Sequence, residues 1–262
     1  SKPVITVSAG DPDWTKNWIN SEHSFDVEAS SNSAYIDSVS CSVDGENGNV
    51  ITDGKAFTCK ESVSVDGDAR TSLNGNRILL TDGKHEITFT AKDYADETAS
   101  AKVTVKIDKT APVVEIKDYN KSDNFNTATK TDQACFNISY SDATSGIDSV
   151  SAILRKKVIT TDPKTGETTE TFTDIEKYST DATDDNYKLT VDGVNKEIQI
   201  PGLDKPDDAS GTYSLTLVAT DIAGNTCKEV TRELYVNLSD ITVSKFALNV
   251  DSKTVDLTAD NI

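Results

Sequence analysis

The sequence predicts an all-β protein made of two tandem β-sandwiches. Apolar residues alternate with polar ones over short stretches, and this period of two is typical of half-buried strands. Two such stretches, GKHEITFTAKDYADET (83–98) and GTYSLTLVATDIAGNT (211–226), align without a gap, which indicates an internal repeat. The 262 residues are enough for two domains of ordinary size. No stretch has the pattern of a long amphipathic helix, so we expect strands throughout.

The repeat extends through most of the chain. FDVEASSNSAYIDSVSCSV, from Phe25, aligns without a gap with FNISYSDATSGIDSVSAIL, from Phe136, so the offset is 136 − 25 = 111. Upstream, KPVITV aligns with APVVEI at an offset of 109, and downstream SVSVDG aligns with KLTVDG at an offset of 126. The offset thus grows by 126 − 111 = 15 towards the downstream pair, which predicts an insertion in the second copy.

The junction IDKTAPVVEI separates the two copies. Pro112 lacks an amide donor and keeps the preceding residue extended, which suits the start of an edge strand. We therefore expect one sandwich at 1–108, a second at 109–238, and a β-tail or the start of a third domain at 239–262. About seven short strands per unit, with turns every ~8–12 residues, indicate two packed sheets in each.

The chain is strongly acidic, with a net charge of −18. The charge is spread as −8, −8 and −2 over 1–108, 109–238 and 239–262. Such a surface repels phosphate backbones and anionic bilayers, so we expect no nucleic-acid partner and no membrane contact in this segment. There is no methionine, signal peptide or transmembrane span, and we expect the chain to be an excerpt from a longer one.

The segments SDATSGIDSV, GTYSLTLVATDIAGNT and IDKTAPVVEI together resemble the tandem bacterial immunoglobulin-like (Big-type) domains of Gram-positive cell-surface proteins. The resemblance covers nearly all of 1–238 and implies two tandem immunoglobulin-like β-sandwiches. It departs in the first unit, where DYADE replaces DIAGN and SSNSAYIDSV replaces SDATSGIDSV. The resemblance therefore does not imply that these loops have the same function in both units.

The resemblance implies a non-catalytic stalk or spacer on an extracellular, wall-attached bacterial protein, with adhesive contacts as a further role. The alternatives are a dedicated ligand-binding adhesin and a carbohydrate-binding accessory module of a secreted enzyme. The expected partners are neighbouring domains of the same longer chain, with host glycan or extracellular matrix protein as further ones. We expect the segment to be a monomer.

Histidine usage argues against catalysis. The two histidines, His23 and His85, both lie in the first unit. His85 aligns with Tyr213, at a position where immunoglobulin-like sandwiches carry a Tyr that bonds back to the backbone, so we interpret it as a packing substitute. The second unit has no histidine, and neither unit can assemble a Ser-His-Asp, Cys-His or His-rich metal site. We expect no enzyme activity, no catalytic residue and no cofactor.

The four cysteines fall two to a unit. Cys41 and Cys59 follow successive segments of the first unit and can close a local disulfide in an oxidising compartment. Whether they do so stays open. In this topology the second strand, which begins near Cys135, and the last strand, which begins near Cys227, start at opposite ends of the second sandwich. The two Cα atoms are therefore too far apart for a disulfide, and we predict that both cysteines are free thiols.

Acidic loops are the sharpest candidate site. In the immunoglobulin topology, the loop with Asp142 and the loop with Asp221 and Asn225 lie at the end where the chain enters the second unit with Asp108. Three carboxylates and an amide there can hold a calcium ion that stiffens the junction. Asp and Asn are also ordinary turn residues. We adopt the turn interpretation and assign no metal ligand.

Three further features are hypotheses at this point. KKVITTDPKTGETTETF predicts a long hairpin around 162–166, either a decoration or a contact arm. Trp14 and Trp18 are either packed over the sandwich edge or exposed as a platform for sugar rings. Lys117 and Asn137 lie on early strands of the second unit and would form an isopeptide bond only if both were buried with a carboxylate.

Overall fold

The computed structural model describes residues 1–52, 58–66, 77–118, 134–192, 196–203, 209–237, 247–250 and 253–256. Apart from one 3-10 turn, Trp14–Lys16, every named element in these ranges is a β-strand. The fold is therefore all-β, as the alternating sequence predicts. Among the described residues, no helix has the length and apolar character needed to span a bilayer.

The described part of the first sandwich has two sheets with the strand orders β1-β3-β6-β7 and β2-β9-β8-β4-β5. Most neighbours are antiparallel, and β2–β9 and β6–β7 are short parallel pairs. The strands are β1 (Val4–Ser8), β2 (Trp18–Ile19), β3 (His23–Ser30), β4 (Ile36–Val43), β5 (Glu46–Thr52), β6 (Thr58–Asp66), β7 (Arg77–Leu79), β8 (Gly83–Asp93) and β9 (Thr98–Ile107).

The described part of the second sandwich has its strands in the immunoglobulin-like order. Its first, second and fifth strands form the sheet β10-β11-β14, and the others form the sheet β13-β12-β15-β16. The strands are β10 (Val113–Lys117), β11 (Cys135–Ser141), β12 (Ile147–Thr161), β13 (Thr168–Ser179), β14 (Lys196–Gln199), β15 (Gly211–Asp221) and β16 (Val230–Val236).

Each sandwich has its own hydrophobic core. In β3 and β8 alternate residues are buried, and Phe25 and Phe89 from the two sheets meet edge to face at 5.9 Å. In the second core Phe136 and Leu215 are fully buried. Burying one such side chain contributes about 1.5–3 kcal/mol. Two separate cores allow each sandwich to be stable in its own right.

The two sandwiches are built from the same parts. The first residues of β1 and β10 are offset by 113 − 4 = 109, and those of β8 and β15 by 211 − 83 = 128, as the sequence repeat predicts. The pairing of β4 with β8 has a bulge directly after Ile36, and the pairing of β12 with β15 has the same bulge after Ile147. The repeat is therefore structural down to its irregularities.

One predicted equivalence is wrong. β6 pairs with β3, opposing Phe25 to Val63, whereas β14 pairs with β11, opposing Phe136 to Ile198. The offset between these strands is 198 − 63 = 135 rather than 126, so the insertion before this strand of the second unit is longer than predicted. KLTVDG lies outside the named strands. Its short alternating pattern and Asp-Gly turn imitate the end of β6 without its pairing.

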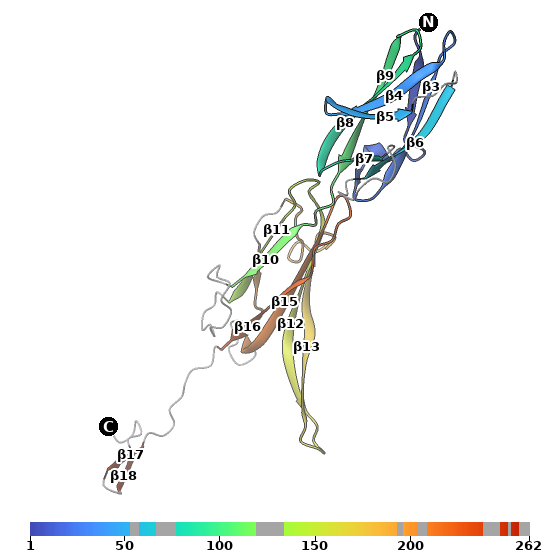
Figure 1. Ribbon diagram of the computed structural model, residues 1–262. Coiled ribbons are helices and arrows are strands. Elements are labelled where there is room, and N and C mark those ends of the chain that lie inside the picture. Colours follow the sequence, from blue (N-terminus) through green and yellow to red (C-terminus); the bar gives the residue numbers. More distant parts are fainter. Residues whose placement is uncertain are drawn as a thin grey trace.

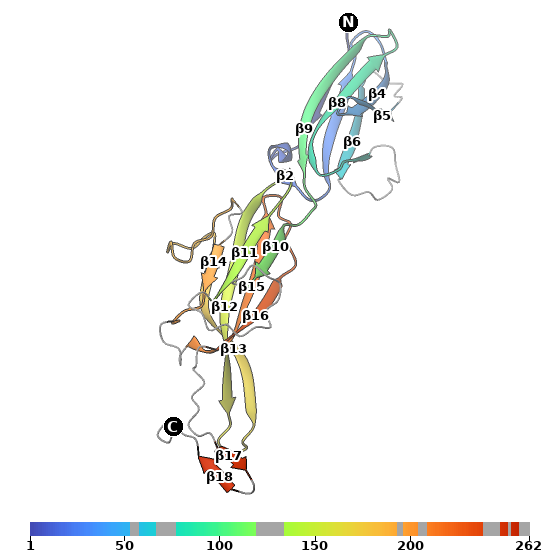
Figure 2. The same ribbon diagram turned by 90° about the vertical axis from the view of Figure 1, so that its left-hand side faces the viewer.

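Figures 1 and 2 show the two sandwiches joined end to end, with the N-terminus at the far end of the first. β12 and β13 continue as a two-stranded ribbon past the end of the second sandwich, away from the first (Figures 1 and 2). This ribbon is the predicted hairpin, and we call residues 157–172 the arm. Within 239–262, β17 (Ala247–Val250) and β18 (Lys253–Asp256) pair as an antiparallel hairpin.

Candidate functional site

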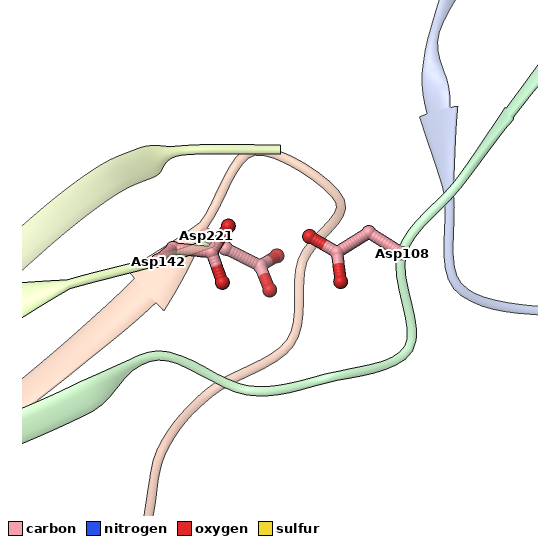
Figure 3. A group of neighbouring side chains, drawn as sticks. All are labelled: Asp108, Asp142 and Asp221. Atoms are coloured by element: carbon pink, nitrogen blue, oxygen red, sulfur yellow. The ribbon is translucent and has the colours of Figure 1, made fainter. Parts of the chain in front are cut away.

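Three carboxylates meet where the chain passes from one sandwich to the next. Asp108 follows β9 in the linker, Asp142 follows β11, and Asp221 ends β15 (Figure 3). One carboxylate oxygen of each lies within 4.8 Å of one from each of the other two. The prediction that these loops converge at the junction is confirmed.

Asp142 organises the loop between β11 and β12. Its Oδ1 accepts hydrogen bonds from the backbone N–H groups of Thr144, Ser145 and Gly146 at 3.0, 2.9 and 2.8 Å. Gly146 has φ +88°, a conformation that favours glycine. The SDATSG sequence therefore folds as a tight turn around one carboxylate oxygen. Asp142 is only half-buried.

Asp221 performs the same task for the loop between β15 and β16. Its Oδ1 accepts the backbone N–H of Asn225 at 2.8 Å, and its Oδ2 accepts the Asn225 side-chain Nδ2 at 2.7 Å. Gly224 has φ +91° and donates its N–H to the Asp221 carbonyl at 3.0 Å. Asp221 is buried, with 1% of its surface exposed. The turn interpretation of DIAGN therefore accounts for these contacts.

Asp108 is the residue that joins the two sandwiches. It is fully buried, and its Oδ2 accepts the Ser145 N–H at 2.9 Å while its Oδ1 accepts the Thr110 N–H at 3.1 Å. Burial raises the pKa of the Asp108 carboxyl, and the nearby Asp142 charge raises it further, while hydrogen bonds from Ser145 and Thr110 oppose the rise. The cost of this buried charge is thus only partly offset.

The linker backbone is bonded to both sandwiches. The Asp108 N–H donates to the Ile19 carbonyl at 2.9 Å on the first side, and the Asp108 carbonyl accepts Asn225 Nδ2 at 2.9 Å on the second. Asp82, in the turn before β8, accepts the Lys109 N–H at 2.9 Å and the Thr110 hydroxyl. Sequence reasoning missed Asp82, since an Asp-Gly pair signals only a turn. The joint is therefore fixed by hydrogen bonds rather than left as a free tether.

The cluster can act in two ways. As turn residues, Asp142 and Asp221 already accept backbone and amide N–H groups, which is sufficient reason for both. As oxygen ligands, the three carboxylates match the chemistry of a hard divalent cation such as calcium, which takes about 6–8 oxygens. Asp108, Asp142 and Asp221 are the residues that would hold such an ion, and its positive charge would offset their mutual repulsion.

The histidines serve packing in the described structure. His85 Nε2 lies 2.8 Å from the Thr81 carbonyl, four residues upstream, and the Tyr213 hydroxyl donates to the Ala209 carbonyl, also four residues upstream, at 2.7 Å. His85 therefore substitutes for the backbone-bonding Tyr, as predicted. His23 packs against Trp14 with ring centroids 5.1 Å apart and ring planes tilted by 42°. Among the described residues, the three aspartates above are the only group of His, Cys, Asp and Glu with metal-binding geometry.

The two indoles are half-buried rather than displayed. Trp14 packs on Phe25 with ring centroids 4.6 Å apart and donates Nε1–H to the Ser24 carbonyl at 3.0 Å. Trp18 belongs to β2 and pairs with Lys106 of β9. Of the two hypotheses for these residues, the geometry supports packing over the sandwich edge.

Cys135 and Cys227 are free and buried, as predicted. Burial raises the pKa of the Cys135 thiol to about 11. Cys227 Sγ accepts the Ala219 N–H at 3.2 Å. The side chain of Cys59 lies outside the described residues, so whether Cys41 and Cys59 form a bridge stays open.

An isopeptide bond does not fit the geometry of its candidate pair. Lys117 and Asn137 are register partners on β10 and β11. However, Lys117 Nζ pairs with Glu115 Oε2 at 3.2 Å and its side chain is 37% exposed. Asn137 Nδ2 donates to the Asp118 carbonyl at 2.6 Å. The amine is thus solvated and ion-paired rather than buried against the amide.

No protein-family model and no curated protein matches the sequence. Several solved structures are similar at a low level. The fibronectin(III)-like modules of Clostridium thermocellum CbhA share 11% identity over 89% of this chain and 94% of theirs, with a TM-score of 0.29. A tetra-tandem repeat from the extending region of a large adhesion protein shares 17% over 90% of this chain, with a TM-score of 0.32, and this chain spans only 50% of its length.

A third structure, from a 1.5-MDa bacterial ice-binding adhesin, shares 11% identity over 100% of this chain and 71% of its own, with a TM-score of 0.36. Two of these three structures are described as coming from an adhesion protein or an adhesin. At such identities and TM-scores, the likenesses assign neither a family nor a function to this chain.

Proposed function

We propose that this chain is a non-catalytic spacer from the extracellular part of a bacterial surface protein. The observation that carries the proposal is the joint, in which Asp108 is hydrogen-bonded to Ile19 of one sandwich and to Ser145 and Asn225 of the other. Relative motion is the default between domains connected by a plain linker. A linker that is hydrogen-bonded to both sandwiches instead favours one fixed, end-to-end arrangement.

A fixed arrangement suits a part whose task is to hold another module at a distance. Two stacked sandwiches reach further than one globular domain of the same length, and a net charge of −18 favours the solubility of such a rod. Location at the bacterial surface and attachment to a longer chain belong to this proposal. Adhesive contacts would be a second task, for which the arm is the candidate because it stands clear of the sandwich.

Small-angle X-ray scattering of the chain in solution tests the rigid joint. The native chain should give one extended particle, whereas a Gly-Ser-Gly insertion after Thr110 should give the broadened distribution of a flexible pair. The same insertion after Lys164, at the exposed arm tip, is the matched control and should leave the sandwich separation unchanged. Native scattering that fits a flexible pair of sandwiches rather than one extended particle would overturn the proposal.

Binding to an immobilised panel of host glycans, plant polysaccharides and matrix proteins separates the spacer from its alternatives. The panel is run with calcium and with chelator. A spacer gives no reproducible binding while remaining folded by circular dichroism. Reproducible binding to a glycan or matrix protein would replace the spacer proposal with that of an adhesin or carbohydrate-binding module.

A further inference from the structure

The arm is a strand pair without a third strand. β12 pairs with β15 only as far as Lys156, and β13 is the outermost strand of its sheet. From Val158 to Ile175 every residue is exposed. A lone two-stranded ribbon is marginally stable in water, and three or more strands are needed for independent stability. The arm therefore gains stability from any strand that pairs with its edge.

The outer edge of β13 lacks the features that usually block such pairing. Natural edge strands carry charged side chains, above all lysine, or proline or a bulge to prevent edge-to-edge association. The stretch Thr168–Asp174, TTETFTD, has no lysine and no proline, and it is rich in residues that favour strands. The two charges of this stretch, Glu170 and Asp174, are already paired with Lys157 and Arg155 of β12. The bulge beside Asp174, which leaves Ile175 unpaired, marks the end of this open stretch. The free edge of β12, in contrast, begins with Lys157.

The two faces of the arm differ in chemistry. One face is occupied by internal pairs, since Lys157 lies over the Phe172 ring at 5.4 Å and pairs with Glu170 at 3.1 Å. The other face has a row of threonines on β13, at positions 169, 171 and 173. Opposite them on β12 are Thr160, Val158 and Lys156. Pairing that keeps these faces matched would extend the threonine row across a second ribbon.

We propose that the arm pairs with the arm of a second copy of this chain, β13 against β13 and antiparallel, with its two-fold axis at Thr171. Faces match across a two-fold axis perpendicular to the ribbon only when the axis passes through a residue. A centre at Glu170 opposes that residue to itself, and a centre at Phe172 opposes Glu170 to Asp174. The centre at Thr171 opposes no like charges.

This register gives favourable cross-strand neighbours. Thr171 faces its own copy and Thr169 faces Thr173, which are pairs that hydrogen-bond across antiparallel strands. The result is a closed, isologous dimer with a four-stranded ribbon at its centre. Each chain carries a net charge of −18, so the bodies repel, and the dimer tightens as salt screens them. This inference goes beyond the spacer proposal, which stands whether the chain is a monomer or a dimer.

Analytical ultracentrifugation of the whole chain, over a wide range of concentrations and at low and high salt, tests the dimer. Native chain should associate with concentration, and more tightly at high salt. Thr171→Glu and Thr171→Lys each place a like-charge pair on the axis and should raise the dimer dissociation constant about five- to tenfold. An equimolar mixture of the two variants should restore association, because glutamate then faces lysine.

Thr98→Glu is the matched control, an exposed threonine on strand β9 of the other sandwich. It should dimerise like the native chain. All variants should melt like the native chain, because both positions are exposed. A native chain that stays monomeric at every concentration and salt would overturn the proposal. A dimer dissociation constant that Thr171→Glu leaves unchanged would also overturn it, and so would an equimolar mixture of the two variants that does not associate. Such results point to another interface or to a different partner for the arm.

Discussion

The equivalent ends of the two sandwiches are built on the same turns but carry different charges. In the second sandwich, Asp142 and Asp221 adjoin the linker carboxylate of Asp108. In the first, Ser31 stands at the position of Asp142 and Asp93 at that of Asp221. Ser31 Oγ accepts the N–H groups two and three residues ahead, at 3.4 and 3.2 Å, as the Asp142 carboxylate does in its own loop.

A hydroxyl therefore suffices for this turn, and the charge of Asp142 is not needed to form it. Ser31 also donates its hydroxyl to Asp93 Oδ2 at 3.4 Å, so the buried carboxylate of the first sandwich gains a hydrogen bond where that of the second gains a like charge. The comparison separates two tasks that coincide in the second sandwich. Accepting the backbone N–H groups of the turn requires only a short polar side chain such as serine. The grouping of three carboxylates, in contrast, is specific to the junction.

The largest effect should come from removing the shared turn carboxylate. Asp93 is fully buried, and its Oδ1 accepts the N–H groups of Ala95 and Glu97 at 2.9 and 3.0 Å. Asp93→Ala should destabilise the first sandwich by about 3 kcal/mol, since two donors lose a charged acceptor. Asp221→Ala should cost the second sandwich less, because it also removes one of three neighbouring carboxylates.

Urea unfolding with two probes measures this difference. Both tryptophans lie in the first sandwich, so their fluorescence follows that sandwich alone, while circular dichroism follows both. Equal losses from Asp93→Ala and Asp221→Ala would contradict the inference that charge accumulates at a cost in the second sandwich.

Installing the junction chemistry in the first sandwich should have the next largest effect. Ser31→Asp places a second carboxylate beside buried Asp93 and replaces a donated hydrogen bond with repulsion. We expect a loss of about 2 kcal/mol in the first sandwich, read from tryptophan fluorescence in urea. Ser31→Asn keeps the acceptor without the charge and should lose less than half as much. Similar losses of stability from Ser31→Asp and Ser31→Asn would show that the shape of the new side chain, rather than its charge, destabilises the first sandwich.

The same comparison shows how far the sequence determines fold and site. Alternating residues located β8 and β15, and the immunoglobulin topology implied by the resemblance placed Asp142 and Asp221 at one end, because that strand order brings those loops together. The pairing of β14 was missed, since KLTVDG carries the same local pattern without the partner strand. The hydrogen bonds from the linker residues Lys109 and Thr110 to Asp82 were also missed, because they depend on how the linker lies against the first sandwich. The local sequence pattern predicts strands and turns, but which of these elements contact each other depends on tertiary packing.

The reverse substitution should be mildly stabilising. Asp142→Ser copies Ser31, keeps an acceptor for the turn and removes one of the three carboxylates. In chelator we expect the second sandwich to gain about 1 kcal/mol, measured by thermal unfolding followed by circular dichroism. A loss of stability in chelator would mean that the Asp142 carboxylate is needed for the turn after all.

Chelator matters in that measurement because a bound cation would offset the same repulsion. Repeating the melts in calcium separates the two interpretations of the cluster. Calcium that raises the melting temperature of the native chain but not of Asp142→Ser would identify the carboxylates as its ligands. Calcium without effect on either chain would leave the turn interpretation as the complete account.

The smallest effect is the pH dependence contributed by Asp108. Burial raises the pKa of this carboxyl in the folded chain, so on acidification the folded chain binds the proton before the unfolded chain does. The native chain should therefore gain stability relative to Asp108→Asn, which cannot titrate, as the pH falls from neutral through the raised pKa towards the ordinary value of 3.8. Asp108→Asn can change the melting temperature by an amount that does not depend on pH. The melting temperature of the native chain minus that of Asp108→Asn should nevertheless increase as the pH falls. A difference that stays constant with pH would mean that the hydrogen bonds from Ser145 and Thr110 balance the burial of the charge, and one that moves the other way would mean that they outweigh it.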